Sequence, residues 1–198
     1  MEKQIIFIFF LIIGYFLGSI PFGYIISKSK NIDIRKKGSG ATGATNVSRF
    51  LGIKYAILVA VLDVLKAIIP IFFAKFYFQE GIELALISIA PVLGHIFPVW
   101  LKFKGGKGVS VIFASIIMTI GWKYSLIILV FWALCLFFIK IMSLTNILLF
   151  LILPFLFWHL TNSYIYVGLG IFYVLIIWWA HRENIKRLLK GTEPKIIK

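Results

Sequence analysis

The sequence predicts an all-α, polytopic membrane protein with about seven transmembrane helices. Of its 198 residues, 61% are hydrophobic and only 14% are charged, whereas a soluble domain has about 25% charged residues. The mean hydropathy is +1.01, and several apolar runs approach the roughly 20 residues that cross a bilayer as a helix. These observations exclude a soluble enzyme, a disordered chain and a fibrous repeat, and they predict one integral-membrane domain over residues 1–198.

Seven apolar segments justify the predicted helix count. The segments are 5–26, 55–74, 83–101, 109–121, 124–141, 144–160 and 164–180. The first is too long for a cleavable signal, so it is expected to remain as a span. It also contains Gly14 and Gly18, a G-x-x-x-G pattern that predicts close packing against another helix.

Three of these segments depart from a plain apolar span. The second contains Asp63 and Lys66 one turn apart, which predicts an internal ion pair or a face turned to a polar cavity. The third is expected to be broken by Pro91, Gly94 and Pro98. The fourth, 109–121, is short, so it is expected to be tilted, re-entrant or half-spanning.

The basic residues predict the orientation of the chain. Of the 21 lysines and arginines, 17 fall in the alternate connections that follow the first, third, fifth and seventh segments. Three lie on the opposite side and one lies inside the second segment. Since positive loops stay inside, this places the N-terminus outside and the C-terminus in the cytoplasm. The charge belongs to membrane loops, so we expect membrane lipid as a partner and no nucleic acid.

The first polar loop, Lys37 to Arg49, combines three glycines, four hydroxyl side chains and one amide between cations. Backbone amides freed by glycine can surround an oxyanion, hydroxyls can donate to it and arginine can clamp it. The residues expected to contact substrate are Gly38, Ser39, Gly40, Thr45, Asn46 and Arg49. A flexible, solvated linker is the alternative. A dinucleotide site is excluded, because its glycine fingerprint requires a βαβ unit.

The second polar loop contains a basic, glycine-rich core before the fourth segment. This core consists of Lys104, Gly105, Gly106, Lys107 and Gly108. A helix N-terminus there would add its partial positive charge to the lysines, which favours phosphate binding. His95 precedes this loop on an apolar segment and is expected to be structural.

The third polar segment follows the last span. His181 and Asn184 are three residues apart, so they share one face if the helix continues. An ordinary amphipathic, positively charged tail is the alternative, but it makes no use of His181, Asn184 and Glu193. All three polar segments are predicted to be cytoplasmic, where they would bind phosphate-bearing molecules at the lipid surface.

The three segments resemble the motifs of the bacterial acyl-phosphate:glycerol-3-phosphate acyltransferases. The similar stretches are Ser39–Arg49, Gly94–Val109 and His181–Glu193, in the family's order and over nearly the whole chain. Two departures are Ala41, where the family usually has asparagine, and Ala180, where a basic residue often precedes the histidine.

The resemblance implies a multi-pass enzyme of the bacterial inner membrane with its active site facing the cytoplasm. It would transfer a fatty acyl group from acyl phosphate to the 1-hydroxyl of glycerol 3-phosphate, giving 1-acyl-glycerol 3-phosphate and phosphate. The residues implied to be catalytic are Ser39, Arg49, Lys107, His181 and Asn184. Gly105, Gly106, Lys107 and Gly108 would shape the glycerol-phosphate site, and Glu193 would be structural.

The chemistry leaves the general base open. His181 has an unperturbed pKa near neutrality, but a substrate phosphate with a second pKa of about 6 could take the same proton. No metal or other cofactor is expected, because the sequence has no clustered ligands. Function as a monomer is compatible with the sequence.

A membrane transporter of a phosphorylated solute is the alternative function. Transporters usually bind near the midplane and often contain inverted repeats, whereas the polar motifs here lie in loops on one predicted face.

Overall fold

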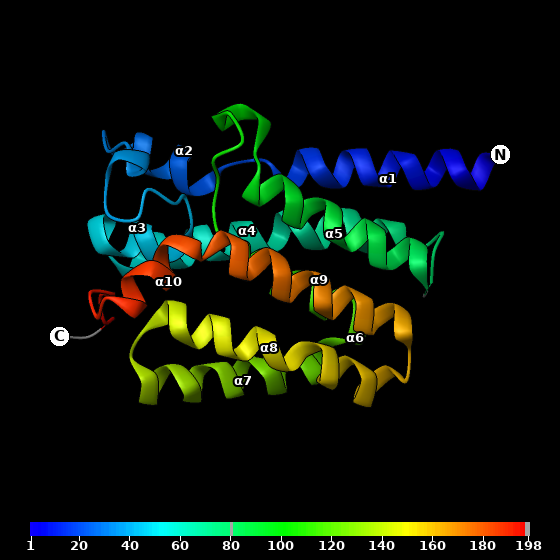
Figure 1. Cartoon of the computed structure of the whole chain (residues 1–198). Coiled ribbons are helices and arrows are strands. Elements are labelled where there is room, and N and C mark those ends of the chain that lie inside the picture. Colours follow the sequence, from blue (N-terminus) through cyan, green and yellow to red (C-terminus); the bar gives the residue numbers. More distant parts are fainter. Residues whose placement is uncertain (80, 197–198) are drawn as a thin grey trace. The chain divides into compact units, whose positions relative to one another are not determined.

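The computed structural model describes residues 1–79 and 81–196, and its regular secondary structure over these residues is entirely helical. It divides into two compact units, Met1–Thr119 and Ile120–Lys198, which are described separately. The α-helices, labelled in Figure 1, are α1 Glu2–Gly18, α2 Phe22–Lys28, α3 Ala44–Leu51, α4 Ile53–Ala74, α5 Ile82–Ile96, α6 Val109–Ile120, α7 Trp122–Ile139, α8 Met142–Thr161, α9 Tyr164–Ala180 and α10 Arg182–Leu189. Two short 3-10 helices, η1 Ile34–Lys36 and η2 Val99–Leu101, lie in the polar loops.

In the first unit, α1 packs closely against α5, as the two glycines predicted. A Cβ atom at Gly14 would lie 3.3 Å from the Ala90 side chain. A Cβ at Gly18 would meet the Pro91 backbone, including its carbonyl carbon at 2.7 Å. The absence of side chains at both positions therefore allows the helix backbones to approach each other.

Substitution of Gly18 by alanine is expected to destabilise the protein by about 1–3 kcal/mol, because the added methyl group overpacks this contact. Gly168→Ala in α9 is the matched control, since nothing lies within 4 Å of a Cβ built there. It is expected to be neutral or stabilising, since alanine favours the helix by about 1 kcal/mol over glycine. Thermal unfolding of the two variants in detergent tests the pair, and equal melting temperatures would contradict it.

The third apolar segment is broken at Pro98, as expected, but not at Pro91 or Gly94. Helix α5 continues through Pro91 and Gly94 and ends at Ile96, before Pro98. A Cβ at Gly94 would meet the α1 backbone, including the Ser19 amide nitrogen at 2.8 Å. Packing against a neighbouring helix stabilises such residues inside a membrane helix. The first apolar segment, which was not expected to be broken, is interrupted between α1 and α2, at Ser19–Pro21.

In the second unit, α8 packs between α7 and α9. The α8–α9 contact is close, because a Cβ at Gly170 would lie 2.9 Å from the Pro154 Cα atom. The Trp132 indole of α7 donates to the Asn146 amide oxygen of α8 at 2.8 Å. Helix α10 follows α9 after a bend of 64° and also packs against α8.

Within the described residues, five helical segments are long and apolar enough to cross a membrane. They rise to six if the bent pair α9–α10 counts as one span. Helix α6 is a 12-residue apolar helix, which agrees with the short fourth segment that the sequence predicted. The protein is therefore an all-helical, multi-pass membrane protein, and the count of seven spans stays a prediction.

Candidate functional site

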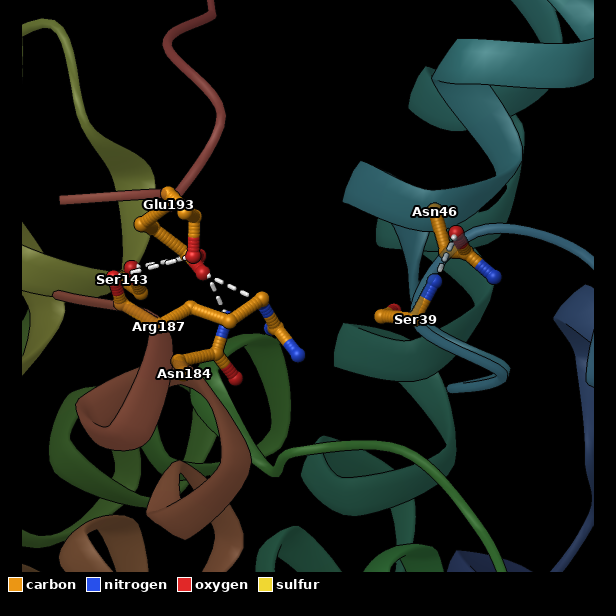
Figure 2. Close-up of polar contacts among 7 residues, drawn as sticks. Ser39, Asn46, Ser143, Asn184, Arg187 and Glu193 are labelled. Atoms are coloured by element: carbon orange, nitrogen blue, oxygen red, sulfur yellow. Dashed lines mark hydrogen bonds and ion pairs between the residues drawn. The ribbon is translucent and has the colours of Figure 1, made fainter. Parts of the chain in front are cut away.

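The first polar loop is organised by the buried side chain of Asn46, near the start of α3. Its amide nitrogen lies within hydrogen-bond distance of three carbonyls, those of Ile34 at 3.3 Å, Lys37 at 3.0 Å and Ala41 at 3.0 Å. Its amide oxygen accepts from the Ser39 backbone N–H at 3.2 Å, as Figure 2 shows. Asn46 therefore holds the loop in shape, which favours a positioning role over the direct phosphate contact expected from the sequence.

The contact at Ala41 bears on the departure from the family pattern. Asn46 binds the backbone carbonyl of Ala41, so this interaction does not depend on which side chain residue 41 has. Gly38 is required in the same place, because it has a φ of +55° and a Cβ there would overlap the Asn46 amide oxygen. The glycine is thus explained by loop geometry.

An ion pair fixes the beginning of this loop. The Asp33 carboxylate accepts two hydrogen bonds from the Arg35 guanidinium, at 3.0 and 2.8 Å. The hydrogen bond from Arg35 lowers the pKa of Asp33 to about 2. The Arg35 guanidinium also lies over the Tyr24 ring at 4.4 Å, which ties η1 to α2.

The remaining first-loop residues lie around this frame. Ser39 is half-buried, Gly40 has a φ of +71° and Thr45 lies in the first turn of α3. Arg49 lies in the last turn of α3 with an exposed side chain. An exposed guanidinium beside a loop of glycine and hydroxyl groups is suited to anion binding.

The second polar loop is built on His95, at the end of α5. The Gly106 N–H donates to the His95 carbonyl and the Gly105 N–H donates to the Ile96 carbonyl, each at 3.1 Å. A Cβ at Gly106 would overlap the imidazole of His95. The two glycines therefore allow the loop to lie directly on the histidine.

The loop then leads into α6. Lys104 is exposed and Lys107 is half-buried. Gly108 has a φ of +86°, which places the chain at the start of α6 at Val109. The lysines thus lie beside a helix N-terminus, where the partial positive charge of the helix adds to theirs.

Asp63 and Lys66 form the internal ion pair that their spacing predicted. The Lys66 ammonium lies 2.7 Å from the Asp63 carboxylate, and both side chains are almost fully buried. The ammonium also lies 2.9 Å from His95 Nδ1. The sequence indicated the pair but not its third member, because Lys66 and His95 are 29 residues apart.

In the second unit, His181 and Asn184 are both buried, at the bend between α9 and α10. His181 Nδ1 lies 2.9 Å from the Ile177 carbonyl oxygen. A carbonyl only accepts, so Nδ1 holds the hydrogen, and Nε2 is the basic nitrogen of the neutral ring. The bend therefore sets the orientation of the imidazole.

Glu193 joins the C-terminal segment to two helices of the second unit, α8 and α10. Its Oε1 accepts from Ser143 at 2.8 Å and from Asn184 at 2.6 Å, and its Oε2 accepts from Arg187 at 2.7 Å (Figure 2). The Glu193 side chain is only 4% exposed. Neither Ser143 nor Arg187 was among the residues predicted for the site, since neither stands out from its surroundings by residue type.

The pKa of Glu193 predicts acid-sensitive stability. Burial raises this pKa, but the hydrogen bonds from Asn184, Ser143 and Arg187 outweigh burial, so the pKa lies below its ordinary value of 4.5. A lowered carboxyl pKa contributes stability above the ordinary value, and this stability is lost as the pH falls through the folded-state pKa. Melting temperatures measured from pH 6 downward should fall more steeply for the wild type than for Glu193→Gln, and parallel curves would contradict the prediction.

Among the described residues, no group of three histidine, cysteine or acidic side chains is placed to hold a metal ion.

The residues expected at the site fall into two sets, one in each unit. The first and second loops, with His95, belong to the first unit, and His181, Asn184 and Glu193 belong to the second.

Comparisons with known proteins agree over nearly the whole chain. The model of the glycerol-3-phosphate acyltransferase family matches residues 8–191. A glycerol-3-phosphate acyltransferase of Prochlorococcus marinus (strain MIT 9312) is 40% identical over 96% of this chain and 97% of its own length. The enzyme of the same name from Maridesulfovibrio salexigens is 40% identical over 94% of this chain and 95% of its own length.

Two crystal structures of PlsY, described as an integral membrane glycerol 3-phosphate acyltransferase, have the same fold. The glycerol 3-phosphate form has a TM-score of 0.91 at 36% identity, covering 96% of this chain and 95% of PlsY. The lysophosphatidic acid form has a TM-score of 0.88 at 36% identity, covering 96% and 94%. The family match and the full-length relatives together show that this chain belongs to the glycerol-3-phosphate acyltransferase family.

Proposed function

We propose that this protein transfers a fatty acyl group from acyl phosphate to the 1-hydroxyl of glycerol 3-phosphate. The products are 1-acyl-glycerol 3-phosphate, which is lysophosphatidic acid, and inorganic phosphate. The observation that carries the proposal is the match of 96% of the chain, at a TM-score of 0.91, to an acyltransferase structure in its glycerol 3-phosphate form. The acyl phosphate donor comes from the resemblance of the three motifs.

The central chemical demand is to hold two anions together. Acyl phosphate is a mixed anhydride with a good leaving group, so orientation of the hydroxyl on the carbonyl carbon matters most. Arg49 and Lys107 neutralise the two phosphates, while the Ser39 hydroxyl donates to their oxygens. Gly38, Gly40 and Gly106 allow the two loops to adopt the shape that surrounds these groups. The exposed Arg49 and the Asn46-ordered loop support this assignment.

The second unit supplies the other proposed catalytic groups, His181 and Asn184. Glu193 holds Asn184 through the 2.6 Å hydrogen bond to its amide. Residues from all three polar segments therefore serve one reaction in a single integral-membrane domain over residues 1–198. The alternating basic loops support seven spans, an outer N-terminus and a cytoplasmic active site in the bacterial inner membrane.

His181→Gln distinguishes the two bases that can take the hydroxyl proton. If Nε2 of His181 is the base, turnover falls about 10²–10⁴-fold, with the KM for glycerol 3-phosphate little changed. If a substrate phosphate takes the proton, the variant keeps most of its turnover. Turnover at saturating substrate, measured as phosphate release, is the readout.

Phosphate release from palmitoyl phosphate tests the proposed reaction. The purified protein is assayed with and without glycerol 3-phosphate, and lysophosphatidic acid is measured in the same samples. Release that requires glycerol 3-phosphate and matches lysophosphatidic acid formation supports the proposal. A folded protein that forms no lysophosphatidic acid with this donor would overturn it.

A further inference from the structure

The buried Lys66 ammonium contacts groups from three separate segments of the first unit. It lies 2.7 Å from the Asp63 carboxylate on its own helix and 2.9 Å from His95 Nδ1 on α5. It also donates to the Ile20 carbonyl at 2.8 Å, where the chain breaks between α1 and α2. The contact with Asp63 is an ion pair, and the contacts with His95 and Ile20 are hydrogen bonds.

The contact with His95 connects Lys66 to the second polar loop. The ammonium can only donate, so His95 Nδ1 accepts and the orientation of the imidazole is fixed. The same ring lies against Gly106, where a Cβ would overlap it, and the His95 carbonyl accepts from the Gly106 N–H at 3.1 Å. The position of the Lys104–Gly108 loop therefore depends on His95, which Lys66 holds.

The contact with the Ile20 carbonyl connects Lys66 to the first polar loop. Ile20 immediately precedes Pro21 and α2. Helix α2 packs against the first loop so closely that a Cβ at Gly23 would overlap the Thr42 carbonyl oxygen. Lys66 thus anchors the beginning of the helix against which the first loop lies.

We infer that Asp63 and Lys66 are positioning residues for substrate binding. They fix the position of the second polar loop through His95 and that of the first polar loop through Ile20. Asp63 supplies the charge that keeps the ammonium stable inside the helix bundle. Neither side chain contacts substrate in this arrangement. The inference rests on the proposed role of both loops in binding phosphate groups.

The test begins with the double variant Asp63→Leu/Lys66→Met. Removing one partner alone would leave a buried unpaired charge and unfold the protein, whereas apolar replacement of both avoids that cost. The double variant is expected to fold, with a thermal midpoint lowered only by the loss of the donor to His95 and to the Ile20 carbonyl. Its KM for glycerol 3-phosphate should rise at least tenfold, with a smaller change in kcat.

Lys75→Met is the matched control for this variant. Lys75 follows the opposite end of α4 and donates to the Met118 carbonyl at 3.0 Å. It is therefore a lysine bonded to a backbone carbonyl but remote from the polar loops, and the KM of Lys75→Met for glycerol 3-phosphate should equal that of the wild type. A folded double variant with a wild-type KM would overturn the inference.

A second set of variants, a double-mutant cycle of His95 and Gly106, tests the inference if the Asp63→Leu/Lys66→Met variant does not fold. Gly106→Ala should raise the KM for glycerol 3-phosphate, because its methyl group displaces the loop from the imidazole. Asparagine at position 95 removes the ring atoms nearest to that methyl group and retains an acceptor for Lys66. His95→Asn/Gly106→Ala should therefore have a lower KM than Gly106→Ala, and independent, multiplying effects would contradict loop docking on His95.

Wild type and Arg49→Ala are assayed in parallel to separate this inference from the proposed function. If the wild type forms no lysophosphatidic acid, the proposed reaction fails. A different outcome is that the wild type is active and Arg49→Ala inactive while both sets of variants leave the KM for glycerol 3-phosphate unchanged. In that case only the positioning role fails.

Discussion

Arg49→Ala is expected to lower kcat/KM by about 10²–10³, the loss typical when one charged donor to a developing or bound anion is removed. The Arg49 side chain is exposed in the last turn of α3, so its removal disturbs no packing and the melting temperature should not change. The loss should appear with both glycerol 3-phosphate and acyl phosphate as the varied substrate, measured as lysophosphatidic acid formation in detergent.

Two companion variants make the Arg49 result specific. Arg49→Lys keeps the charge but loses the planar fork that binds phosphate through two parallel hydrogen bonds, so its activity should lie between wild type and Arg49→Ala. Lys54→Ala removes an exposed cation shortly after the same helix and should retain full activity. Equal losses in Arg49→Ala and Lys54→Ala would show that only the overall positive charge matters, which would contradict a specific site at Arg49.

Asn46→Ala is expected to have the second large effect, through the shape of the first loop. The substitution leaves three carbonyls and the Ser39 N–H without the partner that joins them. Unsatisfied buried polar groups cost about 1–3 kcal/mol each, and water can reach part of this loop, so we expect a total loss of about 2–3 kcal/mol. The displaced loop should lower kcat/KM about a hundredfold.

The controls for Asn46 separate hydrogen bonding from volume. Asn46→Asp has nearly the same shape but places an oxygen against the three carbonyls, so it should be no better than alanine. Ser48→Ala removes one hydroxyl on the same helix that donates to the Thr45 carbonyl at 2.9 Å, and it should change stability by less than about 0.5 kcal/mol. An Asn46→Asp variant with wild-type kcat/KM would show that the amide donors do not hold the loop.

Local pattern made several features of this protein predictable. Each of the seven apolar segments is mainly helical, because a long run of apolar residues can satisfy its backbone in a membrane only as a helix or a closed barrel. The first segment is divided between α1 and α2, and the helix of the third ends before Pro98. The ion pair of Asp63 with Lys66 followed from their three-residue spacing, which places two side chains on one helix face. The G-x-x-x-G pattern of Gly14 and Gly18 predicted a close helix contact, and α5 provides it.

The site was only partly predictable, because a local sequence pattern does not show which groups a residue contacts in the folded chain. The sequence identified the residue types that bind phosphate, but spacing could not distinguish a residue that binds from one that shapes the loop. Asn46 is the clearest example, since its four partners become visible only when residues 34 to 46 fold around it.

The sequence by itself determined the class of protein, its apolar helices and the three polar segments, because each depends on residues that are close in the chain. Only the tertiary structure decided which distant groups meet. Examples are Ser143 with Glu193, 50 residues apart, and Lys66 with His95, 29 residues apart. Hydrophobic periodicity determines which face of a helix is buried, but not which side chain of another helix lies opposite a given residue. Those pairings arise from packing, and packing fixes the loops on which the proposed chemistry depends.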